Sequence, residues 1–141
     1  MNWRLYLFSL IGLVFAVALL GAGLVAFRFT DPQKSGVSNA LLPLLLSGAM
    51  ATCSVMSLWI KRDRMIGMIG IHAGLAVPLI SAIALFLRGF DLQKTDGLAS
   101  PQVVICGIAG VLGVFVFTAM LRTRPPKEER DATPSKTDLQ G

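Results

Sequence analysis

Four long apolar blocks run along the chain, and charged residues separate them. Each block is long enough to cross a bilayer, because about 30 Å of hydrocarbon requires about 20 helical residues. No block contains Asp, Glu, Lys or Arg, and none alternates in polarity as the strands of a membrane barrel do. The sequence therefore predicts an all-α integral membrane protein, a bundle of four transmembrane helices over residues 5–27, 40–60, 65–87 and 103–121.

The composition agrees with this division of the chain. Of the 141 residues, 54% are hydrophobic and 15% are charged, against roughly 25% charged in soluble domains. Residues 1–121 form the predicted transmembrane domain. Residues 122–141 hold prolines and mixed charges without an apolar run, which predicts a disordered tail. Because no soluble domain fits elsewhere, function must reside in the helices, the short connections or the tail.

The basic residues are distributed unevenly about the predicted spans. Nine of the 13 Lys and Arg lie on the side of the two termini and of the connection at 61–64, and four lie on the other side. The positive-inside rule then predicts a protein of the cytoplasmic membrane with both termini in the cytoplasm. The net charge of +5 is explained by this orientation, so the lipid bilayer, and no nucleic acid, is the expected partner.

The first half of the membrane domain resembles the second. Residues 4–34 and 64–94, compared at an offset of 60, share ten of 31 positions, including two arginines and an Asp-x-Gln-Lys sequence. The similarity continues after a one-residue insertion. It predicts two tandem two-helix hairpins, residues 4–63 and 64–121, in the same orientation and related by an axis along the membrane normal.

Two similar polar clusters are expected at the outer face of the cytoplasmic membrane. One interpretation is a binding surface for a polar ligand or a partner. The favoured alternative is turn chemistry, in which the aspartates cap the backbone and nearby glycines adopt positive φ. The clusters are Asp31, Gln33 and Lys34, and Asp91, Gln93 and Lys94.

His72 and Pro78 distinguish the third span from the first, where Gly12 and Ala18 stand at the matching positions. An ionisable residue within a span is a functional candidate, and Pro78 predicts a kink because it lacks a backbone N–H. Together they suggest a gate or a proton-sensitive element. The favoured alternative is a neutral imidazole that bonds a hydroxyl or carbonyl of a neighbouring helix.

Small residues recur at helical spacing in the third and fourth spans. Close approach of helices in lipid depends on such residues, so we expect them at helix contacts within the chain or between chains. They are Gly67, Gly70 and Gly74, and Gly107, Gly110 and Gly113. In the second span, Ser47, Ser54 and Ser57 share one face with Met50. This face suggests either a narrow polar path or hydroxyls that bond backbone carbonyls.

The polar side chains are too few for most membrane chemistry. There is one histidine, two cysteines at distant positions and no carboxylate in a span, so we expect no cofactor, no metal site and no enzymatic activity. The preferred function is a structural or accessory subunit, packing through its glycine-rich faces as a homo-oligomer or within a larger membrane complex. The alternative is a small oligomeric transporter or channel with a kinked third helix.

Overall fold

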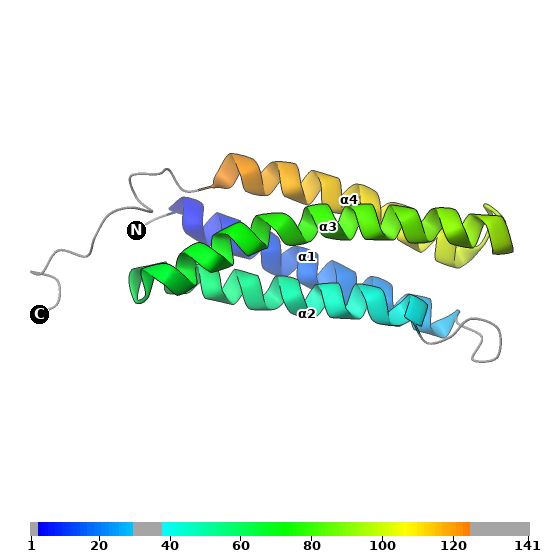
Figure 1. Ribbon diagram of the computed structural model, residues 1–141, viewed down its shortest axis with the longest axis horizontal. Helices are drawn as coiled ribbons and strands as arrows, with labels where there is room; N and C mark the ends of the chain where they lie inside the picture. Colours follow the sequence, from blue (N-terminus) through cyan, green and yellow to red (C-terminus); the bar gives the residue numbers. More distant parts are fainter. Residues whose placement is uncertain (1–2, 30–37, 125–141) are drawn as a thin grey trace, which may run out of the picture.

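The computed structural model describes residues 3–29 and 38–124, and its ribbon is a bundle of four long helices in antiparallel order (Figure 1). Each helix is long and apolar enough to cross a membrane, and the described residues contain no strand. The expected all-helical bundle is therefore confirmed. The helices are α1 (Trp3–Arg28), α2 (Ser38–Leu58, followed by the short 3-10 helix η1, Trp59–Lys61), α3 (Arg64–Asp96) and α4 (Pro101–Thr123).

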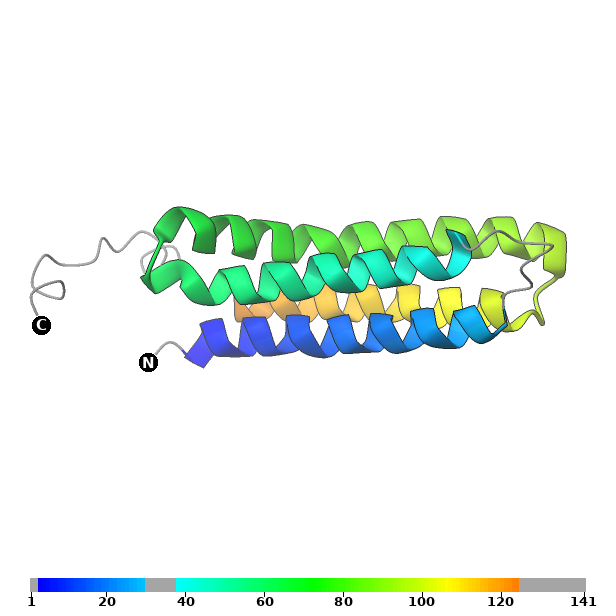
Figure 2. The ribbon, with the colours of Figure 1, turned by 90° about the horizontal axis from the view of Figure 1, so that it is seen from below.

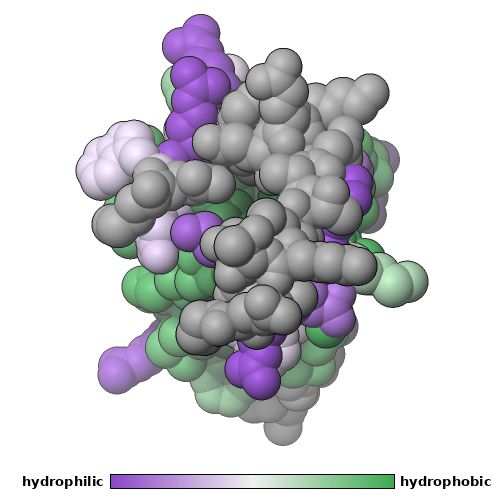
Figure 3. All heavy atoms as spheres, turned by 90° about the vertical axis from the view of Figure 1, so that its left-hand side faces the viewer, coloured by the Kyte–Doolittle hydropathy of each residue, from purple (hydrophilic) through white to green (hydrophobic). Residues whose placement is uncertain are grey.

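The start of α1, the turn after η1 and the end of α4 lie at one end of the bundle, and two views at right angles agree on this (Figures 1 and 2). We name this the inner end, and the opposite end, where α3 ends and α4 begins, the outer end. Seen from the inner end, hydrophilic side chains project at several places around the edge, and apolar side chains are visible between some of them (Figure 3). This distribution suits a bundle whose sides contact lipid and whose end contacts water.

The bundle has large apolar side chains both inside and outside. Phe8, Phe15 and Met50 belong to a continuous buried core. Val17 and Phe115, like many other aliphatic and aromatic side chains of α1 and α4, point outward. A water-soluble bundle has polar residues on its outer faces, so this outward apolar surface fits a hydrocarbon environment.

α3 extends beyond its apolar block, and the expected end at Leu87 is wrong. The helix begins after Asp63, whose carboxylate accepts hydrogen bonds from the backbone N–H of Met65 and Ile66 at 2.9 and 3.4 Å. It ends only before Gly97, which has φ 82° and donates its N–H to the Gln93 carbonyl. Hydropathy marks where a helix meets the membrane surface, whereas a residue at positive φ marks where the helix ends.

The internal similarity does not extend to packing. At the offset of 60, Leu5 is 3% exposed whereas Met65 is 74% exposed. In the second helices, at the offset of 61, Ser54 is 1% exposed whereas Phe115 is 70% exposed. These equated positions therefore lie in opposite environments, although another equated pair, Phe15 and Leu75, is buried in both copies. The difference in burial does not support the expected axis that would relate the two hairpins.

Two predicted features fall outside the described residues. They are the first polar cluster, Asp31, Gln33 and Lys34, and the tail beyond Arg124.

Candidate functional site

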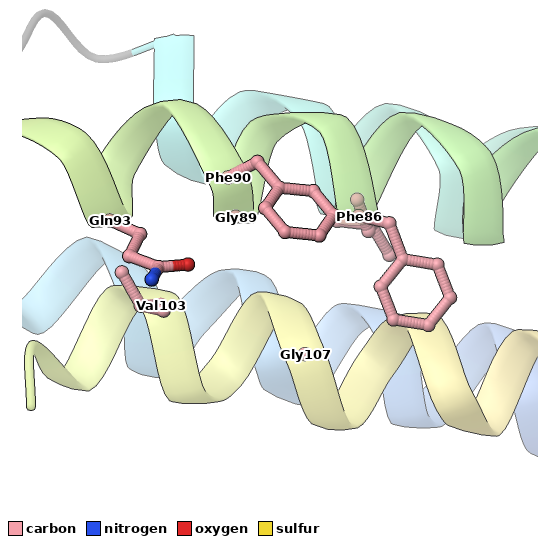
Figure 4. Close-up of a pocket in the computed structure, with 7 residues that line it drawn as sticks. Phe86, Gly89, Phe90, Gln93, Val103 and Gly107 are labelled. Carbon is pink, nitrogen blue, oxygen red and sulfur yellow. The ribbon is translucent and has the colours of Figure 1, made fainter. Parts of the chain in front are cut away.

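A small pocket lies between α3 and α4 near the outer end, and it brings together residues from two predicted groups. Its volume is about 130 Å³. The close-up shows Phe86, Phe90 and Gln93 extending from α3 toward α4, where Gly107 and Val103 form the opposite wall (Figure 4). The Gln93 amide lies beside Val103 in this view. The pocket can therefore accept an apolar group together with one hydrogen bond to an uncharged amide.

The second polar cluster is helical, which corrects its expected place in a turn. Asp91, Gln93 and Lys94 lie in the last turns of α3. Asp91 and Lys94 are exposed, whereas Gln93 is half-buried, because successive helical residues point about 100° apart. Only Gln93 of this cluster lines the pocket. The turn itself contains Gly97, whose positive φ agrees with the turn chemistry expected of a glycine there.

The glycines of α3 lie against neighbouring helices. A Cβ added at Gly67 would overlap the backbone of Ile60, and one at Gly70 would lie 2.5 Å from the Ser57 nitrogen. Gly74 faces the Phe8 ring and Cys53. In each case the missing side chain allows another residue to approach closely.

The glycines of α4 differ from one another. A Cβ added at Gly110 would lie 3.1 Å from the Phe86 ring, and one at Gly113 would lie 3.1 Å from the Pro78 carbonyl oxygen. No atom lies within 4 Å of a Cβ added at Gly107. The expectation that Gly107 packs like the other two is therefore corrected: its missing side chain leaves room for the pocket.

The serine face of α2 is buried against α1. Ser47 donates to the Ala16 carbonyl at 2.7 Å, and Ser57 lies 2.6 Å from Ser9, oxygen to oxygen. Ser54 donates to the Met50 carbonyl on its own helix at 2.8 Å. We call the buried contact of Ser47, Ser54 and Ser57 with α1 the serine seam. Of the two interpretations of this face, the hydrogen bonds agree with hydroxyls that bond carbonyls and a neighbouring helix.

His72 lies on α3 toward the inner end and is exposed. Its Nδ1 is 2.8 Å from the Met68 carbonyl oxygen, and its Nε2 is 3.3 Å from a guanidinium nitrogen of Arg124. A guanidinium only donates, so in this contact Nε2 is the acceptor, which leaves Nδ1 to donate its N–H to the Met68 carbonyl. The geometry therefore suits a neutral imidazole, although its partners are its own helix and an arginine, not a carbonyl or hydroxyl of a neighbouring helix.

Pro78 is fully buried between α3 and α4. The ribbon of α3 is bent along its length in Figure 1, as expected of a helix with an internal proline. The buried proline and His72 lie on different faces of α3, since one is enclosed and the other is exposed. The two candidates therefore do not form one site.

Comparison with models of known protein families, with curated proteins and with solved structures gives no match. The argument for function consequently depends on the geometry of the described residues.

No sequence pattern singled out several of the residues at these sites. Phe86 and Phe90 share a helical face with Gln93, but this spacing is informative only once α3 is known to reach Gln93. Gln102 is 7% exposed, and its side-chain nitrogen donates to the Phe29 carbonyl at 3.0 Å. Its Oε1 has no partner among the described residues. The predicted start of the tail at residue 122 is wrong, because α4 continues to Thr123 and Arg124 follows directly. The contact of Arg124 with His72 depends on the antiparallel order of α3 and α4.

Proposed function

We propose that the chain is a non-enzymatic integral protein of the cytoplasmic membrane that acts as a structural or accessory subunit of a larger membrane complex. The observation that carries this proposal is that the buried polar side chains of α2 make their hydrogen bonds inside the bundle. The buried serines of α2 hydrogen-bond within the serine seam, while the outward faces of α1 and α4 are apolar. Buried hydroxyls that are satisfied in this way stabilise a scaffold.

The structure changes which surface such a subunit would use. Gly67, Gly70 and Gly110 are already in contact inside the chain, so the glycine-rich faces are not available to a partner. We propose the outward face of α2, where Gly48 has open space around it and Thr52 follows one turn later. A hollow continues from Thr52 toward Trp59. Small residues four apart allow a partner helix to approach closely in lipid.

The proposed orientation places the inner end in the cytoplasm, because most of the basic residues lie there. It can be tested in a chain whose Cys53 and Cys106 are replaced by alanine. A single cysteine at Lys94 should react with an impermeant thiol reagent in whole cells, and one at Arg62 should not. The opposite labelling would reverse the orientation.

The internal similarity fits a tandem duplication whose two copies have diverged in packing. The polar matches, such as Arg28 with Arg88, flank the apolar blocks near the proposed membrane surface, although α3 continues past Arg88. We propose that the duplication preserved how each hairpin meets the surface, where snorkelling arginines anchor helices, and not how its helices contact one another.

The serine seam argues against the alternative of a small transporter or channel. That function relied on the serine face of α2 as a polar path. Ser54 and Ser57 are 1% and 0% exposed and pack within the bundle, so a second copy of the chain cannot reach them. A path lined by this face would require α1 and α2 to separate.

Co-purification from the native membrane in mild detergent tests the accessory role. We expect other proteins to accompany the wild-type chain in a fixed ratio. Gly48→Leu should release them, because its side chain would occupy the proposed contact, whereas Gly21→Leu, also in open space on α1, should retain them. A wild-type chain that migrates only as a homo-oligomer would contradict the proposal and favour transport.

A further inference from the structure

An apolar groove separates α1 from α4 in the outer half of the bundle. Its volume is about 310 Å³. Ala18, Gly21, Ala22 and Val25 line it on α1, and Ile105 and Leu112 are among the residues that line it on α4. No atom lies within 4 Å of a Cβ added at Gly21. The groove exists because these α1 side chains are too small to fill the space between the two helices.

The groove fits within one leaflet of a bilayer. From Ala18 to Val25, the first and last α1 residues that line it, the helix axis rises about 10 Å, whereas one leaflet contributes about half of the 30 Å hydrocarbon core. Further toward the inner end, the outward side chains are larger, as at Val14, Val17 and Phe115. The open space is therefore confined to one leaflet.

A positive charge stands where the α1 wall reaches the outer surface. Arg28 follows Val25 by three residues and Gly21 by seven, so it continues the same helical face, and it is exposed. The Gln102 side-chain nitrogen donates to the carbonyl of Phe29, the residue that follows α1, and so ties this end of α1 to α4. A cation thus lies just beyond the outer end of the groove, where an anionic lipid headgroup can reach it.

We propose that this groove binds one acyl chain of an anionic phospholipid from the leaflet at the outer end, with the lipid phosphate beside Arg28. The proposal rests on the membrane location proposed above. Two features favour a lipid over a partner helix. A transmembrane helix would need contact through both leaflets, whereas the groove lies within one. Its positive end complements a phosphate, and Arg side chains bind phosphate with charge-assisted hydrogen bonds.

Lipid retention by the purified full chain tests the proposal. The protein is reconstituted in vesicles of equal phosphatidylglycerol and phosphatidylcholine with identical acyl chains and extracted in mild detergent, and its bound lipid is measured by mass spectrometry. Gly21→Leu should lose most of the retained lipid of both kinds, because leucine occupies the groove. Gly48→Leu, in open space on α2, should retain the wild-type amount.

The headgroup contact is tested separately, with a variant that leaves the groove intact. Arg28→Gln should retain phosphatidylcholine but lose about fivefold of the preference for phosphatidylglycerol, the effect of one basic residue at a membrane surface. Arg62→Gln, an exposed arginine at the inner end, should keep the preference.

Two results would overturn the proposal. They are a wild-type chain that retains no lipid and a Gly21→Leu chain that retains the wild-type amount. If, in the second case, Gly21→Leu also loses partner proteins in the co-purification from the native membrane, the groove would be assigned to a helix. Because retention is measured on the isolated chain, failure of the accessory role would leave this result unchanged.

Discussion

Within each hairpin the two helices pack through different kinds of contact. Between α1 and α2, hydroxyls cross the contact, as in the pair Ser9 and Ser57. Between α3 and α4, small residues receive apolar groups: Gly110 lies against the Phe86 ring, and Cys106 lies against Gly89. Both are ways of packing helices in lipid, where apolar side chains gain little from leaving a solvent that is itself apolar.

This difference shows what the internal similarity preserves. The two hairpins share polar residues that flank their apolar blocks, but many equated positions lie in opposite environments, as Ser54 and Phe115 do. Similar sequences can therefore form the same pair of long apolar helices and still pack through different residues. Within a span, most substitutions among apolar residues preserve the insertion of the helix, while the contacts depend on which face carries the small or hydroxyl residues.

The largest expected effect is at the contact between the two hairpins. Gly70→Ala should lower the free energy of unfolding by about 3 kcal/mol, because its Cβ would meet the backbone of α2 and one helix must shift. The added carbon would lie 2.5 Å from the Ser57 nitrogen. Gly48→Ala, with no neighbour within 4 Å, is the matched control. Unfolding in mixed micelles by SDS titration measures both; equal stabilities would contradict this contact.

A smaller effect is expected within the serine seam. A Cβ at Gly12 would overlap the Ser54 hydroxyl and approach the flexible end of Met50. Gly12→Ala should therefore cost about 2 kcal/mol in the same titration. Because Ser54→Ala removes the overlapping oxygen, the double variant should recover about half of this loss. A double variant whose loss equals the sum of the two single losses would show that Gly12 and Ser54 are not in contact.

Sequence alone predicted the bundle better than the sites. The four helices follow from hydropathy, because a bilayer requires long apolar segments whose backbone groups are satisfied within each helix. The end of α3 did not follow, because the segment from Arg88 to Asp96 is charged or polar at most positions but still forms helix, and the helix ends only before Gly97. The predicted turn at Gln93 was therefore wrong, and the pocket that Gln93 lines could not be foreseen.

The contacts were also only partly predictable. Spacing alone treats Gly107, Gly110 and Gly113 alike, although Gly107 faces open space and the other two face α3. The difference depends on where large side chains such as Phe86 come to lie on the partner helix. Similarly, the contact between His72 and Arg124 joins residues 52 apart, and no local pattern predicts it.

The smallest expected effect concerns the direction of one hydrogen bond in the serine seam. Ser57 donates its only hydroxyl proton to the Ser54 carbonyl at 2.8 Å, so in the pair with Ser9 the proton must come from Ser9. Ser9→Ala then removes a donor and leaves Ser57 bonded, whereas Ser57→Ala leaves a buried donor without its acceptor, which is the costlier loss.

A double-mutant cycle on this pair measures the bond by SDS titration. The coupling between Ser9→Ala and Ser57→Ala should be about 0.6 kcal/mol, the average for hydrogen bonds between membrane helices, and Ser57→Ala should be the more destabilising single change. Thr118 is the matched control. It stands 61 residues after Ser57, is exposed, and bonds only the Val114 carbonyl of its own helix among the interactions of the described residues. Ser9→Ala with Thr118→Val should therefore show no coupling. A coupling equal to that of Ser9 with Ser57 would contradict the assignment of the Ser9 hydrogen bond to the contact between α1 and α2.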